Sequence, residues 1–234
     1  MNYKNKIIAH RGIHNNKEIP ENSMLSFKKA LQEGIPIELD IRLTKDNNLI
    51  VFHDNNLYRM TKRNDFVKMK TLQEIKELYL LDTKEKIPTL KEVLDLVNNK
   101  VLLDIEIKTT NQNINLIRKL IEELDYYQGN FIIKSFNPRI IKILKRKRPN
   151  YQCGLLLTTY QKNIIYKTLT LFPLILVYYK PDFLAINKKM STNKFIKFYE
   201  KNHKILLWTI KSKKELEKYK NTKSFFICDN LPYS

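Results

Sequence analysis

Short apolar runs alternate with helical patterns along almost the whole chain, and this order limits the folds that the chain can adopt. A repeated strand–helix order predicts a parallel sheet that carries its helices on the outside. With 234 residues and eight or nine strands, a closed (β/α)8 TIM barrel is favoured over an open doubly wound sheet. The runs that predict strands lie at residues 6–10, 35–41, 49–52, 101–108, 131–136, 153–157, 182–186, 205–209 and 225–228.

Helical patterns fill most of the intervals between these runs. Asn22 or Ser23 can cap the first helix by accepting hydrogen bonds from its free N–H groups. Only twelve residues separate Asp40 from His53, so the chain is expected to double back there in extended form, without a helix. The stretch around Pro173 is ambiguous, with a helix favoured before that proline. The other helices are predicted at about residues 24–32, 71–78, 87–98, 114–127, 138–148, 193–202 and 213–219.

Nothing in the composition divides the chain into two domains. It contains no long linker, no repeat of about 20–50 residues and no glycine-rich phosphate loop. Its hydrophobic fraction of 43% fits an ordered globular protein with a substantial core. A single domain over residues 1–234 is therefore predicted. No feature of the sequence specifies an oligomeric state.

The net charge of +19 supports two interpretations. A basic surface can attract nucleic acid, an anionic membrane or a phosphate-bearing substrate. The lysines are scattered along the whole length, however, so a genome that favours lysine, asparagine and isoleucine explains most of the charge. One dense basic cluster falls at a predicted helix end, where cations suit the helix dipole. This cluster consists of Lys142, Lys145, Arg146, Lys147 and Arg148.

Neither the cysteines nor the apolar stretches indicate an extracellular or membrane protein. Cys153 and Cys228 lie in apolar, strand-like segments and are expected to be buried, reduced thiols. The N-terminus has no long apolar region after its lysines, so no signal peptide is predicted. The longest uncharged apolar run, at residues 168–179, is too short to span a bilayer. The protein is expected to be soluble and cytoplasmic, with no stable membrane insertion.

Two carboxylates interrupt the second apolar run. Glu38 and Asp40 are two residues apart, so on a strand they point to the same face, about 7 Å apart along the chain. Two neighbouring anions repel each other unless a cation lies between them. Carboxylate oxygens suit a hard divalent cation, and we therefore expect one Mg²⁺ or Ca²⁺ ion at this pair.

Polar residues mark the ends of several other apolar runs. In a TIM barrel the carboxyl ends of the strands meet at one mouth, where active sites are built. Taken singly, a histidine at a strand end is usually structural, and a lone tryptophan usually packs in a core. Charged residues inside a closed barrel, however, need partners or a metal. A metal–phosphate site is predicted from His10 and Arg11, Glu38 and Asp40, His53, Glu106 and Lys108, Ser135, Trp208 and Asp229.

These motifs closely resemble those of the glycerophosphodiester phosphodiesterases, and the resemblance spans nearly the whole chain. Two departures are modest: Ser23 stands where threonine is commoner, and the sequence around Asp229 differs from the usual ending, which leaves the role of that end open. The motifs are His10-Arg11-Gly12, Pro20-Glu21-Asn22-Ser23, Glu38-x-Asp40, Thr44-Lys45-Asp46, His53-Asp54, Glu106-Ile107-Lys108, Ser135-Phe136-Asn137-Pro138, Trp208-Thr209 and Asp229.

The resemblance implies a TIM barrel with a small insertion after the third strand, at about residues 55–89. It implies hydrolysis of a small glycerophosphodiester to sn-glycerol 3-phosphate and an alcohol. It also suggests that the substrate's own glycerol hydroxyl attacks first, to give a cyclic phosphate that water then opens.

The site residues can be assigned roles on chemical grounds. A metal held by Glu38, Asp40 and Glu106 can offset the charge that builds at phosphorus. Arg11 and Lys108 can bind phosphate oxygens. His10 and His53 suit the two proton transfers, in roles that the sequence leaves open. Two aromatic side chains can wall the substrate pocket, although core packing explains them equally well; these are Phe136 and Trp208.

Two rival functions differ in their partners. A lysophospholipase D-like phosphodiesterase would act on lysophospholipids, and the apolar run at residues 168–179 with the basic surface would favour peripheral contact with a membrane. A nucleic-acid-binding protein would use the positive charge, but the chain lacks interleaved basic and aromatic motifs. Nucleic acid is therefore not an expected partner, since the predicted acidic site would repel its phosphates.

Overall fold

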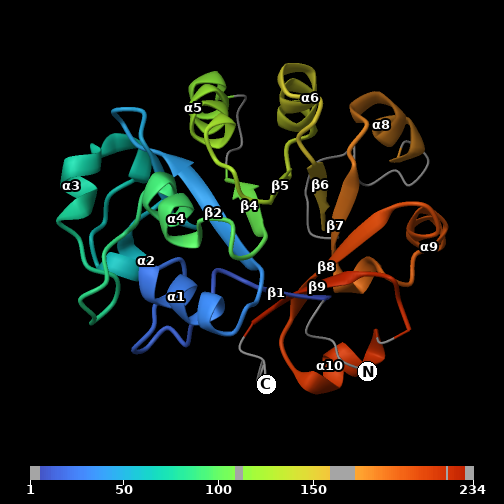
Figure 1. Ribbon diagram of the computed structural model, residues 1–234, viewed down its shortest axis with the longest axis horizontal. Helices are drawn as coiled ribbons and strands as arrows, with labels where there is room; N and C mark the ends of the chain where they lie inside the picture. The colour runs from blue at the N-terminus through green and yellow to red at the C-terminus, as the bar shows by residue number, and fades with distance from the viewer. Residues whose placement is uncertain (1–5, 109–112, 159–171, 220, 230–234) are drawn as a thin grey trace.

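The computed structural model describes residues 6–108, 113–158, 172–219 and 221–229. Within these residues, eight parallel strands close into a barrel because β1 pairs with both β2 and β9. Helices surround the barrel on the outside (Figure 1), so the predicted TIM barrel is confirmed. The barrel strands are β1 (Ile7–Ala9), β2 (Ile37–Leu43), β4 (Leu103–Ile107), β5 (Phe131–Ser135), β6 (Cys153–Leu157), β7 (Phe183–Asn187), β8 (Lys204–Ile210) and β9 (Phe225–Cys228).

The strand β3 (Leu49–Val51) does not belong to the barrel. It runs antiparallel to the end of β2, with Leu49 opposite Leu43 and Val51 opposite Ile41. The turn between the two strands contains no helix, as predicted. The hairpin brings the chain back beside Asp40, whose carbonyl accepts a hydrogen bond of 2.8 Å from the N–H of Phe52. His53 therefore follows directly at the mouth of the barrel.

Polar side chains cap the outer helices, as the sequence indicates. Ser23 caps α1, accepting from the N–H of Ser26 while the Ser26 hydroxyl accepts from the N–H of Ser23. Asn113 and Asn137 cap α5 and α6 in the same general way. These helices are α1 (Met24–Gln32), α4 (Leu90–Val97), α5 (Ile114–Asp125), α6 (Pro138–Lys147), α8 (Phe172–Tyr179), α9 (Lys194–Glu200) and α10 (Lys213–Lys218).

The helix expected before Pro173 is corrected in part. Residues 163–171 of that prediction lie outside the described part of the chain. The helix that is described, α8, begins at Phe172 and continues through Pro173. Proline lacks only a backbone N–H that the first turn of a helix leaves unpaired, and it is therefore tolerated there. No described helix is both long and apolar enough to cross a bilayer.

The barrel interior divides into an apolar half and a charged half. Gly154 belongs to the apolar half, because a Cβ there would lie 2.1 Å from the ring of Phe183. Charged residues fill the part bounded by β2, β4 and β5, where Glu38 pairs in register with Asp104, and Asp40 with Glu106. The apolar cluster consists of Ile8, Leu156, Phe183, Ala185, Leu206 and Ile227.

The segment between β3 and α4 packs around a small core of its own. It carries α2 (Tyr58–Thr61), a 3-10 turn η2 (Val67–Met69) and α3 (Leu72–Lys76). Phe52 and Ile50 of the hairpin join this core. The segment's own members include Leu57, Met60, Val67, Ile75, Leu80 and Ile87.

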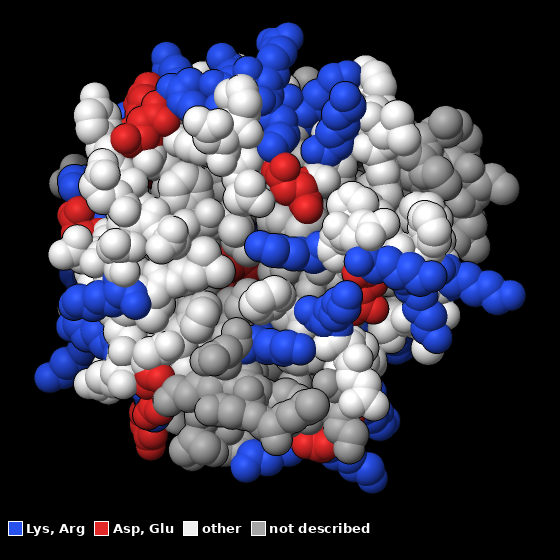
Figure 2. Space-filling view, turned by 45° about the vertical axis from the view of Figure 1, so that its right-hand side comes forward, with Lys and Arg blue, Asp and Glu red and all other residues white. Residues whose placement is uncertain are grey.

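The surface and the thiols follow the sequence expectations closely. Figure 2 shows lysines and arginines spread over the face that it presents, with fewer acidic side chains among them.

Cys153 and Cys228 are both buried and free, as predicted. Burial raises the pKa of each thiol to about 12, so both thiols stay protonated near neutral pH.

Candidate active site

A cavity of about 180 Å³ opens at the carboxyl ends of the barrel strands. Of the eleven residues predicted for the site, eight line the cavity, while Asp40, Ser135 and Asp229 do not. Asp40 is fully buried next to Glu38 and Glu106. The sequence therefore located the residues that the fold brings together. The lining consists of His10, Arg11, Glu38, His53, Glu106, Lys108, Lys134, Phe136, Leu156, Trp208, Thr209 and Ile227.

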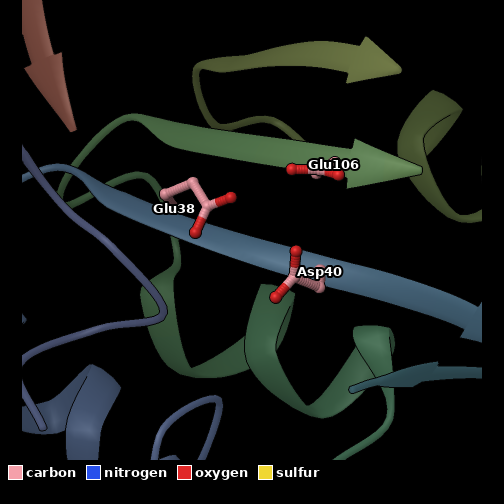
Figure 3. Close-up of side chains that lie close together, drawn as sticks. All are labelled: Glu38, Asp40 and Glu106. Atoms are coloured by element: carbon pink, nitrogen blue, oxygen red, sulfur yellow. The ribbon is translucent and has the colours of Figure 1, made fainter. Parts of the chain in front are cut away.

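Three carboxylates converge from two adjacent strands. Glu38 and Asp40 project from β2, and Glu106 projects from β4 (Figure 3). One oxygen of each lies within 4.8 Å of the others, and all three residues are buried. Asp40 Oδ1 and Glu106 Oε1 are both buried, and each lies within ion-pair distance of the Lys108 ammonium. A buried group of three carboxylates offers only oxygen ligands, which suit a hard divalent cation.

Two cations balance this acidic triad. Lys108 Nζ lies 2.5 Å from Glu106 Oε1 and 3.2 Å from Asp40 Oδ1, while Arg11 Nε lies 3.2 Å from Asp40 Oδ2. Burial alone would raise the pKa of Asp40, but the charges of Lys108 and Arg11 outweigh it and hold that pKa well below its usual range. For Glu106 burial prevails, and its pKa is raised. The triad thus holds two strong cations at the edge of the cavity.

A buried lysine, not predicted as a site residue, lies beside the triad. Lys134 of β5 is 1% exposed, and its Nζ lies 2.6 Å from Asp104 Oδ2 and 3.0 Å from Glu38 Oε1. Burial raises the pKa of Asp104 to about 7, with the nearby charge of Glu38 acting in the same direction. The sequence carried a signal for Lys134, because a lysine within an apolar barrel strand needs an anionic partner.

His10 is hydrogen-bonded to the aspartate whose role the sequence left open. Its Nδ1 lies 2.5 Å from Asp229 Oδ1, and its Nε2 lies 3.9 Å from Glu38 Oε2. Burial alone would lower the pKa of His10, but the charge of Glu38 and the bond to Asp229 outweigh it and raise that pKa. Asp229 therefore fixes the orientation of His10 and favours its protonated form.

His53 has a neighbouring aspartate of its own. Its Nδ1 lies 2.6 Å from Asp54 Oδ1. Burial lowers the pKa of His53, and the charges of Lys108 and Arg11 lower it further against the opposing charge of Asp40. Arg42 donates from Nε to the carbonyl of His53 at 2.9 Å and from Nη1 to the carbonyl of Lys108 at 3.1 Å. No role for Arg42 or Asp54 was predicted from the sequence, although Asp54 belongs to the His53-Asp54 motif.

The loop before α1 supports the site from outside the barrel. Glu21 Oε1 accepts a hydrogen bond of 2.7 Å from Arg11 Nη1. Asn22 Nδ2 donates to Asp40 Oδ2 at 2.9 Å. Asn22 was considered only as a helix cap, and the structure gives the cap to Ser23. The pKa of Glu21 falls to about 2 because hydrogen bonds and charges from Arg59 and Arg11 outweigh its burial.

Two aromatic rings provide the apolar wall of the cavity. Phe136 follows β5 and Trp208 lies in β8, with ring centroids 5.8 Å apart at 87°. Both are partly buried and pack against the apolar half of the barrel interior. Within the described residues, Trp208 Nε1 is buried without a hydrogen-bond acceptor. The two rings thus both pack against the core and line the cavity.

The model of the glycerophosphoryl diester phosphodiesterase family matches residues 10–224 of this chain. The chain belongs to this family. It is accordingly an enzyme, a phosphoric diester hydrolase of the glycerophosphodiester phosphodiesterase type. The match begins at His10 and includes every residue of the cavity lining except Ile227.

Individual members of the family resemble the chain in sequence and in fold. A glycerophosphodiester phosphodiesterase from Caldanaerobacter subterraneus subsp. tengcongensis is 40% identical over 169 residues, which cover 65% of this chain and 69% of that protein. The crystal structure of a glycerophosphodiester phosphodiesterase from Thermotoga maritima superimposes with a TM-score of 0.78. The two sequences are 26% identical, and the match covers 96% of this chain and 94% of the Thermotoga maritima chain. A third similar protein, an Oleispira antarctica phosphodiesterase, was solved in complex with the product sn-glycerol-3-phosphate. Its sequence is 24% identical, and its structure matches with a TM-score of 0.80 over 95% of this chain and 92% of the Oleispira antarctica chain.

Proposed function

We propose that the enzyme hydrolyses glycerophosphodiesters to sn-glycerol 3-phosphate and an alcohol, using one Mg²⁺ or Ca²⁺ ion. One observation carries the proposal: a buried triad of carboxylates shares a cavity with two histidines, each of which is paired with its own aspartate. The product bound to the Oleispira antarctica relative supports the choice of product. The relatives named above do not favour the lysophospholipid alternative, and we do not carry it forward.

The charges around the triad support a metal-assisted site. Four buried carboxylates, Glu38, Asp40, Asp104 and Glu106, face three cations, Arg11, Lys108 and Lys134. With all seven groups ionised, the carboxylates exceed the cations by one negative charge, which would repel a phosphodiester; the raised pKa values of Asp104 and Glu106 reduce this excess when those groups are protonated. A divalent ion held by the triad would reverse the excess to one positive charge, matching the single negative charge of the substrate. The ion would also supply Lewis-acid polarisation of a phosphate oxygen.

Arg11 and Lys108 suit the binding of the remaining phosphate oxygens. The guanidinium of Arg11 is oriented by Glu21 and Asp40 on its far side, and it still lines the cavity. A planar fork that is fixed in this way can bind a phosphate oxygen with little loss of entropy. Lys108 adds a point charge at the same wall. Both cations stabilise the charge that accumulates as phosphorus is attacked.

The two histidines differ in the direction of their pKa shifts, which suggests their roles. Burial and neighbouring cations lower the pKa of His53 and favour a neutral base. Although burial opposes it, Glu38 and Asp229 raise the pKa of His10 and favour a protonated acid. We therefore assign His53 to accept the proton of the attacking hydroxyl and His10 to donate a proton to the leaving oxygen.

Two successive displacements account for the overall reaction. In the first, the glycerol hydroxyl attacks phosphorus, its proton passes to His53, and the departing alcohol takes a proton from His10. In the second, water attacks the cyclic phosphate, its proton passes to His10, and the ring oxygen takes the proton held by His53. Each histidine thus returns to its starting protonation state after one turnover. Phe136 and Trp208 would form the apolar wall of the substrate pocket during both steps.

The products formed from glycerophosphocholine test this function. Phosphorus NMR of the complete reaction should show sn-glycerol 3-phosphate, and a separate choline assay should find one equivalent of choline. The synthetic cyclic glycerophosphate should also be opened to a glycerol phosphate by the same enzyme. Release of phosphocholine and glycerol would show that the other phosphoester bond is cut, and this result would contradict the proposed function.

A further inference from the structure

We propose that Arg59 of α2 is a positioning residue that holds His53 and Arg11 in their working orientations. The inference rests on the proposed function of those two residues, and it gives the segment between β3 and α4 a part in catalysis. Arg59 does not line the cavity, and it acts through two carboxylates that lie between it and the site.

The guanidinium of Arg59 connects these two carboxylates. Its Nε donates to Asp54 Oδ2 at 2.5 Å. Its Nη2 donates to Glu21 Oε1 at 2.6 Å, and its Nη1 donates to Glu21 Oε2 at 3.1 Å. A paired, two-point contact of this kind fixes the plane of the carboxylate as well as its position.

Each carboxylate also contacts a residue of the proposed machinery. The second oxygen of Asp54 lies 2.6 Å from Nδ1 of His53. Glu21 Oε1 accepts from Arg11 Nη1 at 2.7 Å, and Arg11 Nε in turn lies 3.2 Å from Asp40. A continuous chain of charged contacts therefore runs from the imidazole of His53, through Arg59, to the guanidinium of Arg11.

The two carboxylates depend on Arg59 to different degrees. Glu21 is only 4% exposed and would keep Arg11 and Asn16 as partners if Arg59 were removed. Asp54 has fewer restraints, because among the described residues its carboxylate contacts only His53 and Arg59. Loss of Arg59 would therefore free the Asp54 carboxylate to rotate, and His53 would lose its fixed orientation.

The position of Arg59 itself is set by the core of its segment. Its neighbours Leu57 and Met60 are both buried in that core, whereas the side chain of Arg59 is 44% exposed. The folded segment thus presents one guanidinium to the barrel mouth. Because this side chain is not a core residue, its removal should alter the site more than the stability of the fold.

Arg59→Ala tests the proposal with glycerophosphocholine as substrate. We expect kcat to fall by about 10–100-fold, as for other groups that orient a catalytic residue, with a smaller change in KM. Arg63→Ala is the matched control, because Arg63 belongs to the same segment and is 62% exposed, and among the described residues its guanidinium has only a 3.9 Å contact with Asp65. Its kcat should stay within about twofold of the unaltered enzyme.

Added guanidinium ion separates positioning from a general effect on folding. It should restore part of kcat in Arg59→Ala without raising its melting temperature, and it should not restore His53→Ala. In a double-mutant cycle, Asp54→Asn with Arg59→Ala should lose little more than Asp54→Asn alone. The reason is that the Arg59–Asp54 contact orients His53, whereas Glu21 keeps Arg11 and Asn16 as partners without Arg59.

Three results would overturn the proposal. The first is a kcat for Arg59→Ala within twofold of that of the unaltered enzyme. The second is a double variant in which the losses of kcat from Asp54→Asn and Arg59→Ala add fully. The third is a loss of kcat that accompanies a lower melting temperature and is not restored by guanidinium ion. Full activity of His53→Ala would instead contradict the proposed function, so the two failures can be told apart.

Discussion

His10 and Asp229 lie 219 residues apart in the sequence but are hydrogen-bonded in the site. This pairing depends on closure of the ring, because closure places β1 beside β9. The predicted closed barrel placed both residues at the ends of strands that meet where the ring closes, but it did not assign the bond between their side chains. Lys134 was not recognised for a related reason: its partners Glu38 and Asp104 come from two other strands. Single side chains of the right type could be predicted, whereas their pairings needed the fold.

The first prediction concerns His10 and His53. Replacing either histidine by alanine should lower kcat by about 10²–10⁴-fold with the fold intact, which is the usual contribution of a general acid or base.

A related prediction concerns Asp229, the aspartate that orients His10. Asp229→Asn should keep part of the activity and shift its pH profile. Because Asp229 raises the pKa of His10 in the free enzyme, its loss should move the basic limb of the kcat/KM profile to lower pH.

Steady-state kinetics between about pH 5 and 9 would measure this shift, with circular dichroism as the folding control. A basic limb that stays in place in Asp229→Asn would remove His10 as the group that sets it.

The second prediction concerns Lys134. Lys134→Met removes the buried cation and leaves Glu38 and Asp104 without compensation, which should lower the free energy of unfolding by about 3–5 kcal/mol. Adding Asp104→Leu removes one of the two uncompensated carboxylates and should restore part of the stability. Urea unfolding of the single and double variants would measure both effects. A single variant as stable as the unaltered protein would show that the ammonium is not needed to balance the two carboxylates.

At the scale of elements, apolar runs predicted the barrel strands, helical patterns predicted most helices, and the short spacing between Asp40 and His53 predicted the hairpin. A period-two pattern put Glu38 and Asp40 on one face, and the structure confirms that placement. The stretch around Pro173 was left ambiguous, because a proline can end a helix or lie in its first turn; in the structure Pro173 lies in the first turn of α8. Local patterns thus predicted elements well, except where one residue type is compatible with two positions.

The third prediction concerns the turn that follows β1. Gly12 has φ +77°, and a Cβ there would lie 2.5 Å from Ser26 Oγ and 2.9 Å from the Ser26 backbone carbon. Gly12→Ala should therefore cost more than about 3 kcal/mol of stability, and lower kcat by displacing Arg11. Gly34→Ala is the matched control, because Gly34 has φ +64° and open space around it. Its cost should stay near 1–2 kcal/mol, the usual penalty for a left-handed backbone.

Thermal unfolding of both glycine variants would measure the difference. Equal losses would show that backbone strain alone, rather than contact with α1, restricts position 12.

At the scale of the whole molecule, the central feature is the division of the barrel interior into an apolar and a charged half. The four carboxylates of the charged half outnumber its three basic groups by one, which supports the proposed divalent cation. The sequence predicted the acidic triad but not this balance, since Asp104 and Lys134 were not recognised as part of it. Many other lysines and arginines lie on the face that Figure 2 shows, outside this group.

The most direct test of this account is the rate of sn-glycerol 3-phosphate release before and after the enzyme is stripped of divalent ions. Excess chelator should abolish release from glycerophosphocholine, and Mg²⁺ or Ca²⁺ added beyond the chelator should restore it. Glu106→Gln should bind the ion more weakly in calorimetry, because it removes one negative charge from the triad. Undiminished release in excess chelator would contradict the metal-dependent mechanism.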